Sequence, residues 1–80
     1  MLFPFCLVAV SQKHRKLLGE SIRSLRKHSG LTLEKMAEKA DLHHNYLGEL
    51  ERGEKAATID SLVKIAKALK IHVRDLVADI

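Results

Sequence analysis

From about residue 15 onward, apolar side chains recur every three or four positions, and this spacing constrains the fold more than any other feature of the chain. Leu18, Ile22 and Leu25 show it first, and further runs begin near residues 33, 44, 59 and 73. Such spacing places apolar residues on one face of an α-helix, whereas a strand would show alternation. The pattern therefore predicts an all-α domain, compact and built from five short helices.

The residues between these runs are typical of helix ends. Gly30 and Gly53 suit the left-handed position that follows a helix. Thr32 and Thr58 suit the N-cap position that precedes one, because their hydroxyls can accept a hydrogen bond from a free backbone N–H. The short Asp41-Leu42 segment leaves room only for a sharp turn between the second and third helices. We expect residues 15–80 to form this domain, preceded by an extension over residues 1–14.

The extension opens with MLFPFCLVAV, an apolar run too short to span a bilayer, which needs about 20 residues. Its aromatic and β-branched residues suit a short strand, and Pro4 would confine that strand to a sheet edge. We expect an apolar arm; pairing with a second copy, a peripheral membrane anchor and an upstream-start artefact are the alternatives. The lone Cys6 cannot form an internal disulfide, which favours a reduced, cytoplasmic setting.

Size and charge favour a binding module over an enzyme. A chain of 80 residues has little room for an enclosed active-site cavity. It carries 14 Lys and Arg against 10 Asp and Glu, and residues 13–28 hold six basic side chains against the single Glu20. That block favours a polyanionic partner. We find no phosphate-binding loop or nucleophile motif, and expect no enzymatic activity, cofactor or small-molecule ligand.

Two adjacent histidines, His43 and His44, raise the alternative of a metal site. On a helix, neighbouring side chains diverge by about 100°, so these two would not converge on one ion. The remaining histidines and Cys6 show no ligand spacing around them. The sequence therefore predicts no metal.

The third helix has two distinct faces when its residues are placed at intervals of about 100°. Leu47 and Leu50 point inward together with Glu51, an acid that needs a partner there. The outward face carries Arg52 and groups that can read base edges in a DNA major groove: an amide for adenine, a carboxylate for cytosine, and a glycine that permits close approach. On its flank, an imidazole can donate to guanine or to phosphate. The predicted base contacts are His44, Asn45, Gly48 and Glu49. An ordinary polar helix surface is the alternative.

Residues 18–76 resemble the lambda-repressor-like helix-turn-helix family. The resemblance rests on these landmarks: Ile22-Arg23-x-Leu25-Arg26, Gly30-Leu31-Thr32, Met36-Ala37, Glu51-Arg52-Gly53 and Leu62-x-x-Ile65-Ala66-x-Ala68-Leu69. Within the family, the stretch LHHNYLGELERG at residues 42–53 looks most like the controller proteins of restriction–modification systems. Two departures stand out: Asp41 replaces the usual glycine of the turn, and Leu33 replaces a frequent glutamine.

The resemblance implies a transcriptional regulator that binds double-stranded DNA at a pseudo-palindromic operator as a homodimer, with the third helix in the major groove. It also implies an ion pair between Glu51 and Arg26, since an unpaired buried carboxylate would be costly. The expected phosphate contacts are Arg23, Lys27, Thr32, Arg52 and Lys55. The apolar stripe expected to serve as core plus dimer contact comprises Val73, Leu76, Val77 and Ile80. The alternative function is a protein-interaction module of the same fold, an antitoxin or adaptor.

Overall fold

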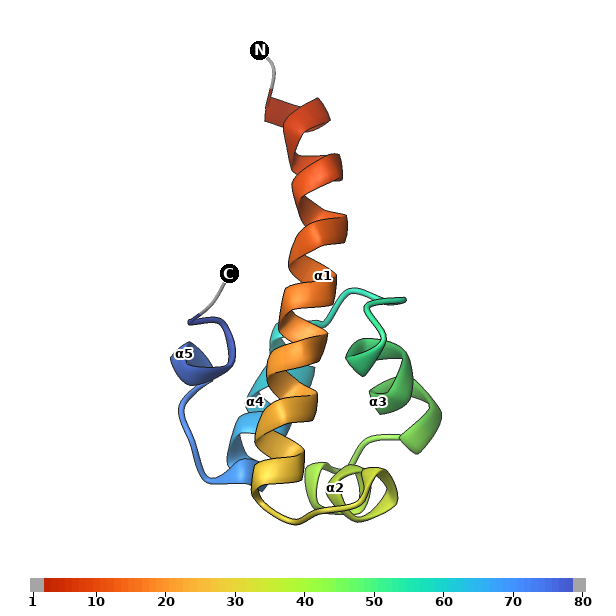
Figure 1. The fold of residues 1–80 in the computed structure, drawn as a ribbon, viewed down its shortest axis with the longest axis vertical. Coiled ribbons are helices and arrows are strands. Elements are labelled where there is room, and N and C mark those ends of the chain that lie inside the picture. The colour runs from red at the N-terminus through yellow and green to blue at the C-terminus, as the bar shows by residue number, and fades with distance from the viewer. Residues whose placement is uncertain (1–2, 79–80) are drawn as a thin grey trace.

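The computed structural model describes the backbone of residues 3–78 and the side chains of residues 13–78. Within that range every regular element is an α-helix, as the sequence predicts for residues 15–80. The helices are α1 (Phe3–His28), α2 (Leu33–Ala40), α3 (His44–Glu51), α4 (Ile59–Leu69) and α5 (Val73–Leu76). In Figure 1, α1 runs along the long axis of the molecule, and the other four helices gather around its C-terminal half.

From Phe3 onward the N-terminal arm is helical, so the expected short strand is wrong. Helix α1 begins at Phe3 and crosses the predicted boundary between residues 14 and 15 without a break; the division into arm and domain stays a prediction. A lone strand would leave its backbone groups unpaired, whereas a helix satisfies them internally. Pro4 is tolerated because it falls in the first turn, where no N–H is needed. In residues 3–78, no helix is long and apolar enough to cross a membrane.

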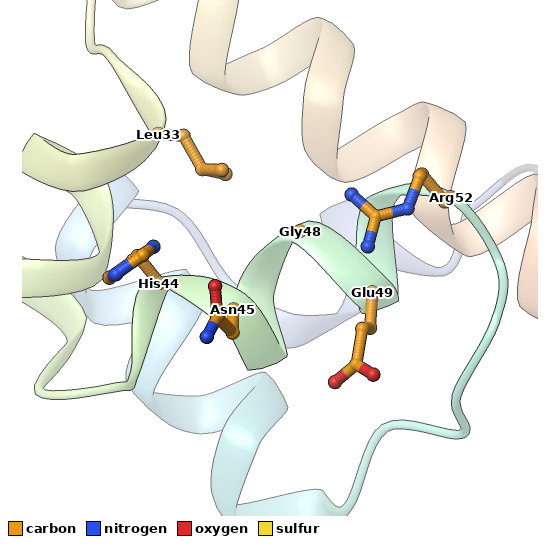
Figure 2. A pocket seen from close by; sticks show the side chains of 6 residues that line it. All are labelled: Leu33, His44, Asn45, Gly48, Glu49 and Arg52. Carbon is orange, nitrogen blue, oxygen red and sulfur yellow. The ribbon is translucent and has the colours of Figure 1, made fainter.

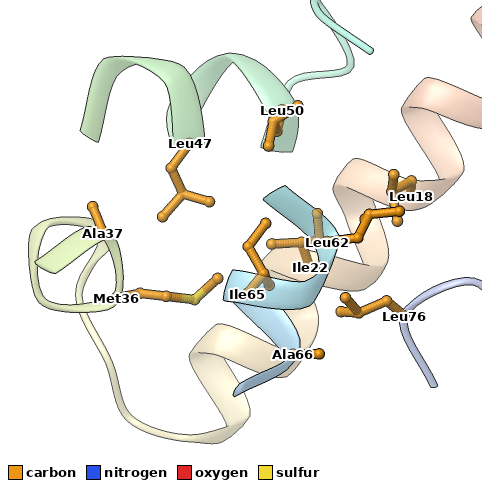
Figure 3. Packing of buried hydrophobic residues seen from close by; sticks show 10 residues of the cluster. All are labelled: Leu18, Ile22, Met36, Ala37, Leu47, Leu50, Leu62, Ile65, Ala66 and Leu76. Atoms are coloured by element: carbon orange, nitrogen blue, oxygen red, sulfur yellow. The ribbon is translucent and has the colours of Figure 1, made fainter. Parts of the chain in front are cut away.

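Every helix contributes at least one fully buried apolar side chain to a single core. Ile22 of α1, Met36 of α2, Leu47 of α3, Ile65 of α4 and Leu76 of α5 are all inaccessible to solvent. Figure 3 shows these side chains converging between the helices. The inward side of α3, through Leu47 and Leu50, is therefore packed in the same core as side chains from the other four helices.

The burial of Leu76 corrects one expectation. Its side chain is 0% exposed within a single chain, so it is part of the core and is not available as a dimer contact. Helix α5 has only four residues and cannot be stable alone, and Leu76 anchors it. Val73 and Val77 are half-buried and pack against the same core. Ile80 lies outside the described residues.

Candidate nucleic-acid interface

The turn between α2 and α3 is closed by Asp41 in a left-handed conformation, with φ 55° and ψ 47°. Its backbone N–H donates to the carbonyls of Ala37 and Glu38, and the N–H of Leu42 donates to Ala37 at 2.9 Å. Glycine is the usual residue here, but aspartate tolerates this conformation better than most. The turn therefore forms despite the departure, and Thr32 caps α2 as expected, accepting from Lys35 N at 3.1 Å.

The start of α3 differs from the expectation for the two histidines. His43 is not helical: it is the N-cap residue with extended backbone, and its Nδ1 accepts a hydrogen bond from Asn45 N at 3.2 Å. Consequently its ring does not diverge from that of His44 but stacks on it, with centroids 5.0 Å apart and an interplanar angle of 19°. Within the described part of the chain, no three potential ligand side chains are grouped to hold a metal.

Helix α3 is oriented largely as its periodicity predicts. Leu47 and Leu50 are buried, at 0% and 2% exposure. His44, Asn45 and Arg52 are exposed on the opposite side, and the side chain of Glu49 is partly exposed at 32%. The polar groups thus share one surface while the leucines fix that surface relative to the core.

Gly48 is an exception to the predicted outward face. It is buried because other side chains cover it: a Cβ placed there would lie 3.1 Å from Arg52 Nη1 and 3.5 Å from Leu33 Cδ2. The spacing of about 100° per residue predicts the angle of residue 48 correctly. It does not predict that the long side chain of Arg52 folds back from the next turn to cover this glycine. The sequence predicts that the backbone at Gly48 is open to close approach by a duplex. In the structure it is covered, and the space beside it accommodates Arg52.

The predicted base-contact residues surround one open hollow of about 270 Å³ (Figure 2). Its wall includes Leu33 at the start of α2, which the sequence marked only as a departure from the family pattern. An apolar side chain in that wall can contact the methyl group of thymine. The residues that line the hollow are Leu33, His44, Asn45, Gly48, Glu49 and Arg52.

The ion pair between Arg26 and Glu51 is present and joins α1 to the end of α3. Arg26 Nε donates to Glu51 Oε2 at 2.7 Å, and Nη2 donates to Oε1 at 3.0 Å. The third donor, Nη1, reaches the carbonyl of Leu31 at 2.9 Å. The hydrogen bond to Glu51 raises the pKa of Arg26 above its ordinary value, against the opposing effect of burial. The two side chains are 12% and 7% exposed, so this pair is a buried brace of the fold.

A second ion pair, which the sequence did not reveal, joins Arg52 to Glu54. Arg52 Nε donates to Oε2 at 2.9 Å and Nη2 donates to Oε1 at 3.3 Å. This hydrogen bond raises the pKa of Arg52 and lowers that of Glu54. Gly53, at φ 75°, turns the chain back so that Glu54 N donates to Glu49 O at 2.9 Å. A glycine at the end of a helix signals such a reversal, and with it the return of the next side chain.

The other four predicted phosphate contacts differ in whether they reach this surface. Arg23 lines a second hollow of about 300 Å³ that shares Leu33, Gly48 and Arg52 with the first. Lys55 Nζ lies 3.8 Å from Glu49 Oε1, a loose pair on an exposed loop. Lys27 and Thr32 are exposed near the α1–α2 connection and line neither hollow. Arg23 and Lys55 are thus brought to the α3 surface, and the other two lie outside it.

Helix α3 is also fixed from its other flank by a hydrogen-bonded chain that the sequence did not reveal. The Tyr46 hydroxyl lies 2.8 Å from Ser61 Oγ, which in turn lies 2.8 Å from Thr58 Oγ1. Ser61 is 5% exposed, and its backbone N–H donates to Thr58 at 3.1 Å, which is the expected cap of α4. The residue that caps α4, Thr58, is therefore also linked through Ser61 to Tyr46 on α3.

A short helix that carries exposed polar side chains, held by a tight turn against a second helix, defines the helix-turn-helix class of DNA-binding domains. Comparison of sequences agrees: the helix-turn-helix family matches residues 22–76. The chain belongs to this family and is a transcriptional regulator of the DNA-binding helix-turn-helix class.

Its relatives include proteins named as controllers. The chain is 38% identical to the control protein C.BamHI of Bacillus amyloliquefaciens over 63 residues, which cover 78% of each protein. It is 39% identical to the control protein C.SmaI of Serratia marcescens over 62 residues, 78% of this chain and 74% of that protein. The crystal structure of the restriction-modification controller protein C.AhdI from Aeromonas hydrophila superposes with a TM-score of 0.76 at 34% identity, covering 78% of this chain and 94% of that one.

Proposed function

We propose that this protein is a restriction–modification controller that binds a pseudo-palindromic operator as a homodimer. The names of two curated relatives and one solved structure support the controller role. The observation that carries operator binding is the shared surface of α3, where His44, Asn45 and Glu49 line one open hollow. These groups offer donors and acceptors that match base edges in the major groove.

The proposed base contacts are the imidazole of His44, the amide of Asn45 and the carboxylate of Glu49. Asn45 can bind adenine with two hydrogen bonds, and Glu49 can accept from the amino group of cytosine. Glu49 would repel phosphates, so it is useful only where it meets a base donor. The proposed phosphate contacts are Arg23 and Lys55 at this surface, and Lys27 and Thr32 outside it near the α1–α2 connection; they supply charge or a hydroxyl without reading sequence.

The proposed homodimer uses Val73 of α5 and Val77, the residue that follows this helix. Both are half-buried, so part of each apolar side chain still faces solvent in the single chain. Two-fold symmetry would place two copies of α3 in half-sites about one helical turn of DNA apart. Light scattering on the purified protein should give twice the chain mass, and Val77→Asp should shift it to a monomer. A monomer in the unsubstituted protein would contradict the proposal.

The test of operator binding is selection of binding sites from random oligonucleotides, followed by titration of the selected duplex at several salt concentrations. The expected result is an inverted repeat, with binding that weakens steeply as salt rises. Genomic copies of that repeat should lie upstream of restriction and modification genes. If no sequence is enriched and a partner protein co-purifies, the interaction-module alternative replaces this function.

A further inference from the structure

We infer that Glu54 is a specificity-determining residue: it neutralises Arg52 and holds the free edge of that guanidinium over Gly48, where it reads a guanine. This inference rests on the proposed DNA binding and deepens it. It assigns to Arg52 a base contact in place of the phosphate contact expected from the sequence. It also gives a role to Gly48. The sequence predicts that Gly48 lets DNA approach the backbone closely, but in the structure this backbone is covered.

The geometry of the Arg52–Glu54 pair determines which donors remain. A guanidinium carries five N–H groups in a plane. Glu54 takes the side edge, through Nε at 2.9 Å and Nη2 at 3.3 Å. Among the described residues, Nη1 makes no hydrogen bond, and with the second N–H of Nη2 it forms a free pair of parallel donors. Such a pair matches guanine O6 and N7, the commonest specific contact made by arginine in the major groove.

The side chain of Arg52 is positioned by Glu54 on one side and by Gly48 on the other. Gly53 at φ 75° reverses the chain, and the hydrogen bond from Glu54 N to Glu49 O at 2.9 Å holds the backbone of Glu54. From that position the carboxylate of Glu54 accepts hydrogen bonds from Arg52. On the opposite side, the missing side chain of Gly48 makes room for Nη1, since a Cβ there would lie only 3.1 Å away. Arg52 thereby lies on the same surface as Asn45, as Figure 2 shows.

Charge distinguishes a base contact from a phosphate contact. A cation that meets a phosphate contributes to affinity by releasing counterions, on any sequence. Because Glu54 neutralises Arg52 and would itself repel a nearby phosphate, the pair adds little to that sequence-independent attraction. Its donors remain available to a neutral base. The pair therefore lowers binding to random DNA while it retains a contact that only the correct base can satisfy.

The first experiment compares Glu54→Gln with the unsubstituted protein by fluorescence anisotropy, on the selected operator and on a random duplex of equal length. Freed from its partner, Arg52 can meet phosphates. Affinity for random DNA should rise about five- to tenfold at 0.1 M salt, and the salt slope should steepen by about one. The ratio of operator to random affinity should fall by at least about fivefold. Glu38→Gln, on the exposed face of α2, is the matched control for a general gain of positive charge.

The second experiment removes the pair as a neutral unit, with Arg52→Ala combined with Glu54→Gln. Repeated site selection should then lose one guanine position in each half-site, while the salt slope on random DNA stays unchanged. Gly48→Ala should give the same loss of preference by displacing Nη1, and should raise the melting temperature because alanine favours a helix. That variant separates a lost contact from a lost fold.

Three results would overturn the inference. Glu54→Gln could match Glu38→Gln on both duplexes. The double variant could keep every guanine position. It could also flatten the salt slope by about one with equal losses on operator and random DNA, which would restore the phosphate contact. Failure of the proposed function looks different, since no operator would then emerge from selection with the unsubstituted protein.

Discussion

Gly19 lies in the middle of α1, where an alanine would normally favour the helix by about 1 kcal/mol. We predict that Gly19→Ala nevertheless destabilises the protein. A Cβ at this position would lie 2.4 Å from the carbonyl oxygen of Leu50, 2.5 Å from that of Glu51 and 2.8 Å from the carbonyl carbon of Glu51. All three atoms belong to the backbone at the end of α3, so no side-chain rotation can relieve the contact.

The magnitude follows from these distances. An ordinary contact to a methyl group is about 1 Å longer, so α1 and α3 must separate by about that amount. Overpacking of a well-packed site typically costs about 1–3 kcal/mol, and a backbone contact belongs at the upper end. After the helix gain of about 1 kcal/mol, we expect a net loss of about 2 kcal/mol. For a domain of this size, that lowers the melting temperature by roughly 8–16 °C.

Thermal unfolding followed by circular dichroism measures the effect, with Gly48→Ala as the matched control. Gly48 is also a helical glycine, but its nearest neighbours are the ends of two side chains, Arg52 and Leu33. The control should therefore gain up to about 1 kcal/mol from helix propensity. If Gly19→Ala melts at or above the unsubstituted protein, the close approach of α1 to α3 is not a feature of the folded protein and the reasoning fails.

Three further predictions concern the surface and its brace. Glu51→Gln should reduce the free energy of unfolding in urea by about 2 kcal/mol, because it weakens charge-assisted hydrogen bonds to Arg26 in a nearly buried site. Arg26→Lys keeps the charge but loses the two parallel hydrogen bonds of the guanidinium, so it should also be destabilising. An unchanged urea midpoint in both variants would refute the structural role of the pair. Asn45→Ala should relax the preference at one base-pair position by about 1–3 kcal/mol, whereas equal losses on operator and random duplexes would contradict a base contact. By NMR titration, the pKa of Glu54 should lie below its usual value and return to it in Arg52→Ala. Because the folded pKa is lowered, the stabilising contribution of Glu54 is present above the unfolded pKa of about 4.3 and is lost as the pH falls through the folded pKa; an ordinary pKa in the unsubstituted protein would show that the pair does not persist in solution.

The sequence alone was sufficient for the number of helices and for most of their ends. These properties are local: the period of apolar residues selects the inward face, and Thr32, Thr58 and Gly53 provide caps through their own hydroxyls or their freedom in φ. The orientation of α3 followed from the same period, because Leu47 and Leu50 cannot be exposed at a comparable free energy. The exception at the N-terminus has the same cause. Residues 3–10 form an uninterrupted apolar run in the sequence, so they show neither helical period nor strand alternation.

Tertiary structure decided how the surface is completed. Whether Gly48 is open or covered depends on a side chain that returns from the next turn, and Arg52 is held there by a residue beyond the helix, Glu54. Whether Leu76 belongs to the core or to an interface depends on how far a four-residue helix sinks between its neighbours. Local preferences set each segment's conformation, but the contacts between segments arise only when the whole core closes, and at those contacts a glycine, a carboxylate or a leucine acquires its role.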